Sequence, residues 1–166
     1  MDEIDRKLLE LLQEDATLSI AQLAERVGLS ATPCWKRIQK LEAKKVITRR
    51  VALVDPNRIG VALTVFVAIE AGAHTTEWLD SFSTSVAAMP EVMALYRMAG
   101  DIDYLLHVAV ADMAEYDALY KRLIAVAPMK NVSSRFAMER IKDTTAYPLH
   151  SRAFRDRRAP EENDEE

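Results

Sequence analysis

A short turn near the N-terminus most constrains how this 166-residue chain can fold. Gly28 can take the left-handed conformation that ends a helix, Leu29 supplies an apolar side chain for the corner, and Ser30 can cap a following helix. Apolar residues at helical spacing predict a helix over residues 20–27 before the turn and another helix directly after it. The pattern therefore predicts a helix-turn-helix.

The residues around this turn complete a small domain. Helical spacing predicts a first helix over residues 4–12, and the helix after the turn has Cys34, Ile38 and Leu41 on its inward side. The β-branched, alternating stretch over residues 46–54 predicts a wing or linker strand. Cys34 is the single cysteine, so no internal disulfide or multi-cysteine zinc site is expected.

Charge is distributed unevenly along the chain. The net charge is −4, yet the segment from Lys36 to Arg50 holds seven Lys and Arg against the single acid Glu42. Five acids lie in the last six residues. A basic stripe on an acidic protein is the arrangement that contacts with DNA phosphates require.

The helix after the turn, with the segment that follows it, offers both kinds of DNA contact. Hydrogen-bonding side chains near the N-terminus of a helix can reach base edges in the major groove, and cations further along can neutralise phosphates. A solvated charged face on a three-helix bundle is the alternative for the stripe alone, and a packed core position is the alternative for Trp35; the helix-turn-helix spacing favours DNA. The predicted contacts with double-stranded DNA are Ser30, Thr32, Pro33, Trp35, Lys36, Arg37, Gln39, Lys40, Lys44, Arg49 and Arg50.

The second part of the chain has a different pattern. Apolar runs and helical stretches alternate as strand, helix, strand, strand, helix, strand, which is the order of a ferredoxin-like α+β domain. The apolar run of the first strand is long enough for a strand buried on both faces. The expected elements are residues 62–69, 76–89, 92–98, 102–110, 112–127 and 131–141. We expect a DNA-binding domain over residues 1–60, a ferredoxin-like domain over 61–149 and a disordered charged tail over 150–166.

The stretch from Arg97 to Tyr104 has two interpretations. Gly100 and Asp101 suit a two-residue hairpin with glycine at the first turn position. Alternatively, an arginine, carboxylates and a phenol around one turn could hold both ends of a zwitterion.

Nearly all of the chain, from Asp2 to about Leu149, resembles the Lrp/AsnC family of bacterial and archaeal regulators. The matching segments are Ile4-Asp5-Arg6, Leu23 to Ser30 and Thr32-Pro33-Cys34. The resemblance implies an N-terminal winged helix-turn-helix and a C-terminal amino-acid-sensing domain, βαββαβ and similar to the ACT domain. It also implies homodimers that assemble into tetramers or octamers. We expect such a dimer to place two recognition helices on an imperfect palindrome.

The resemblance also implies an effector site, because family members bind amino acids near a Gly-Asp-x-Asp-Tyr turn at contacts between dimers. The residues expected there are Arg97, Met98, Gly100, Asp101, Asp103, Tyr104, Ser133 and Ser134. Further segments, including Glu77-Trp78 and Met89 to Val92, resemble a subgroup tied to cysteine detoxification. That similarity makes L-cysteine the first effector to test.

Other functional classes have little support in the sequence. His74, His107 and His150 are scattered, and no phosphate-binding glycine loop is present, so we expect no enzyme, cofactor or metal site. The acidic N-terminus and the lack of a long apolar run predict a cytoplasmic protein with no membrane contact. The remaining alternative is an amino-acid sensor whose helical head contacts a protein.

Overall fold

The computed structural model describes residues 1–149 and divides them into two compact units. We call residues 1–52 together with 142–149 the head, and residues 53–141 the sheet unit. The expected border at residue 60 falls in the irregular segment that enters the sheet unit, and the expected tail over 150–166 lies outside the described residues. No helix within residues 1–149 is long and apolar enough to cross a membrane.

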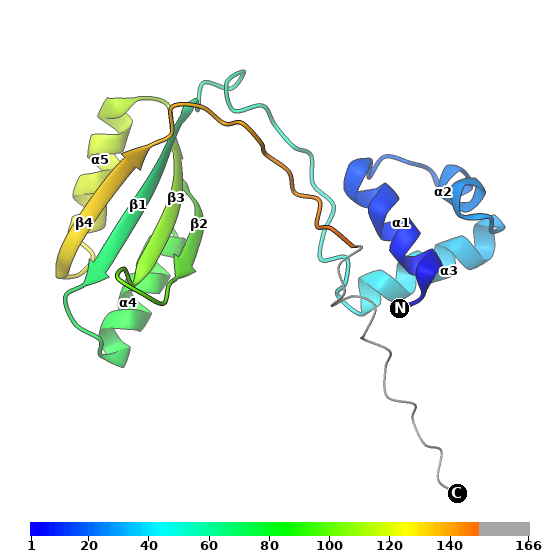
Figure 1. Ribbon diagram of the computed structural model, residues 1–166, viewed down its shortest axis with the longest axis horizontal. Coiled ribbons are helices and arrows are strands. Elements are labelled where there is room, and N and C mark those ends of the chain that lie inside the picture. The colour runs from blue at the N-terminus through cyan, green and yellow to red at the C-terminus, as the bar shows by residue number, and fades with distance from the viewer. Residues whose placement is uncertain (150–166) are drawn as a thin grey trace, which may run out of the picture. The chain divides into compact units, whose positions relative to one another are not determined.

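The head contains the three predicted helices, α1 (Glu3–Glu14), α2 (Ile20–Val27) and α3 (Ala31–Ala43) (Figure 1). Ser19 and Gln22 form a capping box at the start of α2, and Gly28 ends that helix with φ +70°, as the turn predicts. Leu8, Leu23, Ala24, Cys34 and Ile38 form the buried core that the three helices share.

The predicted wing strand over residues 46–54 is wrong for this chain, because the whole segment is irregular. Apart from Ile47, which packs partly buried against the head core, its apolar side chains stay exposed, with Leu53 at 73% and Val51 at 59%. A strand needs a neighbour for its N–H and C=O groups, and no described strand runs beside this segment. Alternation alone therefore does not make a strand here.

The sheet unit has the predicted element order. Its elements are β1 (Leu63–Ala71), α4 (Thr76–Ala87), β2 (Val92–Arg97), β3 (Tyr104–Val110), α5 (Met113–Ile124) and β4 (Met129–Phe136). The strands lie in the order β2-β3-β1-β4, and every neighbouring pair is antiparallel. This is the predicted ferredoxin-like arrangement. The last strand ends at Phe136, five residues earlier than predicted.

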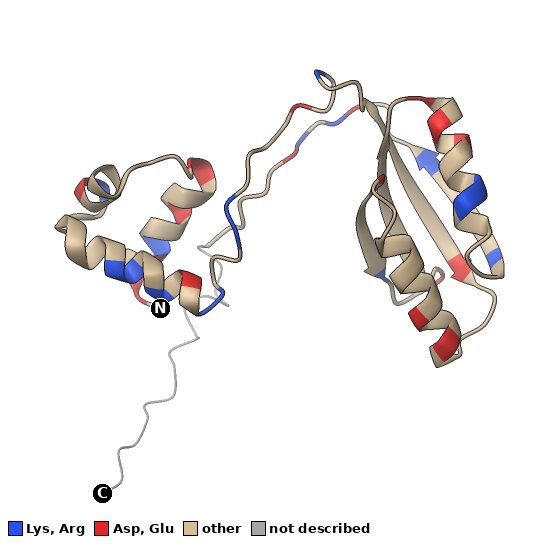
Figure 2. Ribbon diagram, turned by 180° about the vertical axis from the view of Figure 1, so that it is seen from behind, with Lys and Arg blue, Asp and Glu red and all other residues tan. Residues whose placement is uncertain are grey.

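Both helices of this unit cover the same side of the sheet (Figure 2). Val65, Val67 and Ile69 of β1 point into the core under α4 and α5, whereas Phe66 is 39% exposed on the other side and stacks on His107. The prediction that β1 is buried on both faces is therefore wrong. Side chains alternate along a strand, so helices on one side cover only every second residue; on the open side the large Phe66 stays exposed, whereas the small Ala68 is 3% exposed.

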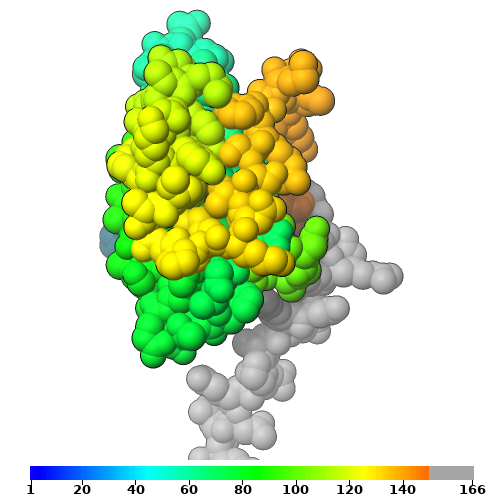
Figure 3. Space-filling model, turned by 90° about the vertical axis from the view of Figure 1, so that its left-hand side faces the viewer, coloured from blue at the N-terminus to red at the C-terminus, as the bar shows by residue number. Residues whose placement is uncertain are grey.

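A close corner joins the end of β1 to the start of β4. The carbonyl oxygen of Pro128 accepts hydrogen bonds from the Gly72 N–H at 3.2 Å and from the Trp78 indole Nε1 at 2.9 Å. A Cβ atom at Gly72 would lie 2.5 Å from that oxygen, so only glycine fits without a backbone shift. On the surface seen in Figure 3, α5 lies beside β4. At the other end of β4, Phe136 is in edge-to-face contact with Tyr116 of α5.

Candidate nucleic-acid interface

Helix α3 has an apolar side and a polar side. Cys34, Ile38 and Leu41 are at most 4% exposed, and Cys34 and Ile38 belong to the core that the head helices share. On the opposite side Trp35 is 49% exposed. The other predicted outward residues Thr32, Lys36, Gln39 and Lys40 are also exposed, whereas Arg37 is half-buried. The helix thus presents hydrogen-bonding and cationic groups together on one side.

Ser30 occupies the N-cap position of α3, but its side chain makes no capping hydrogen bond. A capping serine ordinarily accepts from the N–H of the second or third helical residue. The third helical residue here is Pro33, which has no N–H. The exposed Ser30 hydroxyl is therefore not committed to the helix end.

Four predicted DNA-contacting cations are exposed: Lys36, Lys40, Lys44 and Arg49. Figure 2 shows the Lys and Arg positions along α3 and the chain after it. Within residues 1–149 none of these four side chains takes part in an ion pair. Their charges are available to a polyanion.

Two other predicted contacts meet at one acid. The Gln39 side-chain amide donates to Glu42 at 3.2 Å, and Arg50 pairs with the other oxygen of the same carboxylate at 3.0 Å. Arg50 remains 42% exposed in this pair. Glu42, the single acid of the stripe, therefore ties the irregular segment after α3 back to the helix.

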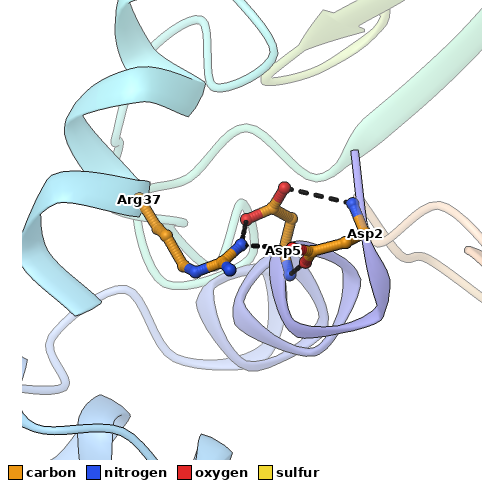
Figure 4. Close-up of polar contacts among 3 residues, drawn as sticks. All are labelled: Asp2, Asp5 and Arg37. Carbon is orange, nitrogen blue, oxygen red and sulfur yellow. Dashed lines mark hydrogen bonds and ion pairs between the residues drawn. The ribbon is translucent and has the colours of Figure 1, made fainter. Parts of the chain in front are cut away.

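Arg37 differs from its neighbours because it contacts the start of α1 (Figure 4). Its Nη1 atom donates to Asp2 Oδ2 at 2.6 Å and to Asp5 Oδ1 at 2.7 Å. Hydrogen bonds to Asp5 and Asp2 raise the pKa of Arg37. The Asp5 N–H, with a contribution from Arg37, holds the pKa of Asp2 below its ordinary value. This side chain thus belongs to an ion-pair group inside the head.

The β2–β3 connection in the sheet unit is longer than the predicted two-residue hairpin. Met98 N–H donates to the Asp103 carbonyl at 2.8 Å, which leaves a four-residue loop over 99–102. Gly100, in this loop, has φ +135°, a conformation that favours glycine. Arg97 and Asp101 are exposed beside it.

Two residues expected to bind an effector, Asp103 and Tyr104, make contacts within the sheet unit. The Asp103 carboxylate accepts from the Ala71 N–H at 2.7 Å and lies 3.8 Å from His74 Nδ1. Tyr104 is 4% exposed, and its ring packs on Phe82 with centroids 4.7 Å apart. Asp103 therefore fastens the β2–β3 loop to the end of β1, and Tyr104 belongs to the core.

Ser133 and Ser134 lie on opposite sides of the sheet. Ser134 pairs with Val67, whose side chain is buried under the helices, and its hydroxyl contacts the Tyr116 hydroxyl. Ser133 pairs with Ala68, so it points to the open side. The two serines therefore cannot both face a pocket on one side of the sheet.

The structure also shows contacts that the sequence reasoning missed. The carboxylates of Asp2 and Asp5 hold Arg37, and the Gln13 side chain pairs with both backbone polar groups of Tyr147, at 2.7 and 3.2 Å. Asp2 and Asp5 were detectable as a capping box from their i, i+3 spacing. The contacts with Arg37 and Tyr147 join residues far apart in sequence, and no local pattern indicates them.

Neither unit offers an evident site for a metal. Among residues 1–149 no group of three or more His, Cys, Asp or Glu side chains is placed to hold an ion. Cys34 is buried in the head core, and burial raises the pKa of its thiol. A buried thiol with a raised pKa is a poor nucleophile.

Comparisons with known proteins agree with both units. Residues 1–42 match the AsnC-type helix-turn-helix domain, and residues 64–147 match the Lrp/AsnC ligand binding domain. The chain is 53% identical over 150 residues to the DNA-binding transcriptional activator DecR of Escherichia coli K12, covering 90% of this chain and 99% of that protein.

Two solved structures are similar over nearly the whole chain. One is an AsnC family transcriptional regulator from Agrobacterium tumefaciens, with TM-score 0.87 and 58% identity, covering 90% of this chain and 97% of that one. The other is a transcriptional regulator from Neisseria meningitidis in complex with L-Met, with TM-score 0.86 and 30% identity over the same shares. The helix-turn-helix head and the ferredoxin-like sheet unit are thus those of a DNA-binding transcriptional regulator, and the chain belongs to the Lrp/AsnC family.

Proposed function

We propose that this regulator binds DNA as a homodimer, which presents two copies of α3 to successive major-groove faces of an imperfect palindrome. The observation that carries the proposal is the division of α3 into a buried apolar side and an exposed side with cations that have no ion pair within residues 1–149. A helix of this kind fits the width of the major groove. Two copies related by a twofold axis would meet half-sites about one helical turn apart.

The side chains have different roles in this proposal. Ser30, Thr32, Trp35, Lys36 and Gln39 lie at or after the N-terminus of α3, where side chains can reach base edges and nearby phosphates. Pro33 is exposed in the first turn and would contribute apolar contact. The remaining cations, Lys40, Lys44, Arg49 and Arg50, would neutralise phosphates, and Arg50 would do so from its pair with Glu42.

Recovery of bound genomic DNA tests this proposal against the alternative that the head contacts a protein. The full-length chain is mixed with sheared genomic DNA of its source organism, and bound fragments are sequenced. We expect discrete fragments for the wild type and a loss of about tenfold or more for the double variant Lys36→Ala, Lys40→Ala. Lys121→Ala in α5 makes the same charge change per residue outside the head and serves as the control. Equal recovery by all three proteins would reject the DNA contact of α3.

We also propose that an amino acid binds beside the β2–β3 loop and changes the assembly between dimers and tetramers or octamers. The L-Met complex of the related Neisseria meningitidis regulator supports an amino-acid ligand. Arg97 and Asp101 are exposed with opposite charges and suit the carboxylate and ammonium of such a ligand. Met98 and Ser133 are the further residues that we assign to this ligand, and a second copy would complete the site.

A thermal-shift panel of the twenty amino acids tests the effector, with L-cysteine first. A ligand that binds the folded chain raises its melting temperature in proportion to the logarithm of its concentration above Kd. If no amino acid raises the melting temperature, the effector proposal fails while the DNA proposal stands. The proposal contains no catalytic step, and it places the protein in the cytoplasm because its partner is DNA.

A further inference from the structure

We infer that Arg37 is a positioning residue, which fixes the recognition helix α3 against the N-terminus of α1 and does not itself contact DNA. The inference deepens the proposed DNA contact and rests on it for two of its three tests. It separates Arg37 from the neighbouring Lys36, although the two residues are adjacent in the basic stripe. The Arg37 guanidinium contacts two carboxylates of α1, whereas the Lys36 side chain is exposed.

The two aspartates use all their carboxylate oxygens. Asp2 Oδ1 accepts from the Asp5 N–H at 2.9 Å, and Asp5 Oδ2 accepts from the Asp2 N–H at 3.2 Å, so one oxygen of each carboxylate caps α1. The other oxygen of each accepts from Arg37 Nη1. The same two side chains therefore cap the N-terminus of α1 and bind Arg37 of α3, as Figure 4 shows.

The charge of this group opposes a phosphate contact. One guanidinium between two carboxylates leaves a net charge of −1, and a phosphate that approached Arg37 would also approach Asp2 and Asp5. Removing the arginine from its carboxylates would leave both anions without their partner. Lys36 has no ion pair within residues 1–149 and is exposed, so it meets a phosphate without that opposition.

Between α1 and α3, the hydrogen bonds of Arg37 depend on direction, whereas the apolar packing of the two helices does not. The core between α1 and α3 consists of apolar side chains such as Leu8, Cys34 and Ile38, which tolerate small rotations of one helix on another. Charge-assisted hydrogen bonds are short and depend on geometry. Base readout needs side chains held to within about 0.5 Å, so a joint that sets the orientation of α3 acts on specificity.

Matched variants of the full-length chain separate positioning from contact. Arg37→Gln removes the ion pairs, and Lys36→Gln makes the same charge change on the adjacent residue. The double variant Asp2→Asn, Asp5→Asn keeps the amide oxygens that can cap α1 and removes the negative charges. A triple variant combines this pair with Arg37→Gln.

The first test measures binding to a random-sequence 40-bp duplex as a function of salt. Lys36→Gln should flatten the slope of log K against log salt by about one for each head bound, because one phosphate contact is lost. Arg37→Gln should leave the slope unchanged. The double aspartate variant frees the arginine and should bind this duplex several-fold more tightly. A slope for Arg37→Gln as flat as that for Lys36→Gln would overturn the inference.

The second test compares a genomic fragment recovered by the wild type with the random duplex. Arg37→Gln should lower the preference for the recovered fragment about tenfold, since a misplaced α3 loses base contacts worth about 1–3 kcal/mol each. An unchanged preference would contradict a positioning role.

The third test needs no DNA, so its failure is distinct from failure of the proposed function. Arg37→Gln and the double aspartate variant should each lower the melting temperature of the head by about 2–6 °C. The melting temperature of the triple variant should be no lower than that of the less stable of these two variants, because all three changes remove the same interaction. Additive losses, or no loss in any variant, would show that the contact does not hold the helices together.

Discussion

Helix α3 and the β2–β3 loop were both predicted to be functional, but the exposure of their predicted site residues differs. On α3 the polar residues predicted to face outward are exposed, with Arg37 as the half-buried exception. In and beside the loop, Arg97 and Asp101 are exposed, but Asp103 bonds to β1 and Tyr104, the first residue of β3, lies in the core. The helical repeat fixes which side a residue faces, whereas the direction of a loop residue depends on the strands around it.

The largest expected effect is a loss of stability on truncation of Tyr104, and it distinguishes a packing role of this residue from a ligand contact. Tyr104→Ala should cost about 3–5 kcal/mol of stability, because a large ring is removed from the contact with Phe82 and Trp78. Tyr104→Phe should retain most of the stability and any amino-acid response. Urea unfolding and the thermal-shift panel measure both. Loss of the response in a stable Tyr104→Phe protein would instead make its hydroxyl part of the effector site.

The two aspartates of the loop offer the next contrast. Asp103→Ala should cost about 1–3 kcal/mol, because the Ala71 N–H loses its acceptor. Asp101→Ala, an exposed change of the same charge, should alter stability by less than about 0.5 kcal/mol and weaken amino-acid binding. Urea unfolding with ligand titration distinguishes the two variants. A stable Asp103→Ala protein that no longer binds its ligand would reverse the assignment.

A smaller effect is expected at residues 142–149, where the chain returns to the head and Gln13 binds the backbone of Tyr147. Gln13→Ala removes both hydrogen bonds to the backbone of Tyr147 and should speed hydrogen exchange at the Tyr147 amide about tenfold. Gln22→Ala, which removes a side chain from the α2 cap instead, is a control for general loosening of the head. Unchanged exchange at Tyr147 in the Gln13 variant would show that other contacts hold residues 142–149.

Acid should weaken the start of α1 slightly. The pKa of Asp2 is lowered in the folded head, first by the Asp5 N–H and then by Arg37, so ionised Asp2 stabilises the head at pH values above its ordinary pKa of 3.8. That contribution is lost as the pH falls through the lowered pKa. The melting temperature of Asp2→Asn should therefore differ from that of the wild type at about pH 6 and approach it as the pH falls through the lowered pKa of Asp2. A difference that is constant with pH would exclude the ionised form as its source.

Much of the fold could be predicted because its signals are local. Gly28 after an apolar repeat marks the turn, and the order of elements in the sheet unit was sufficient for the strand order β2-β3-β1-β4. Ser30 is an exception: a cap was expected from the serine alone, but it makes no capping hydrogen bond, and Pro33 three residues later removes one of the two possible donors. The stretch over residues 46–54 alternates like a strand but has no described neighbour to pair with.

The candidate sites were less predictable because their contacts cross long stretches of chain. Arg37 bonds to Asp5 across 32 residues, and Asp103 to Ala71 across the same separation. Each of these residues has a plausible ligand role when only its neighbours in sequence are considered. In the structure, the Arg37 guanidinium and the Asp103 carboxylate each have a partner within the protein. Those partners can be identified only from the tertiary structure.

Methylation interference on a genomic fragment bound by the full-length protein tests the central claim most directly. Methyl groups at guanine N7 lie in the major groove, where α3 is proposed to bind. We predict that they block binding in two segments about 10 base pairs apart, centre to centre, and that Lys36→Ala weakens binding to the unmethylated fragment. Interference only by methyl groups at adenine N3, which lie in the minor groove, or a single blocked segment, would contradict a dimer that reads DNA with two copies of α3.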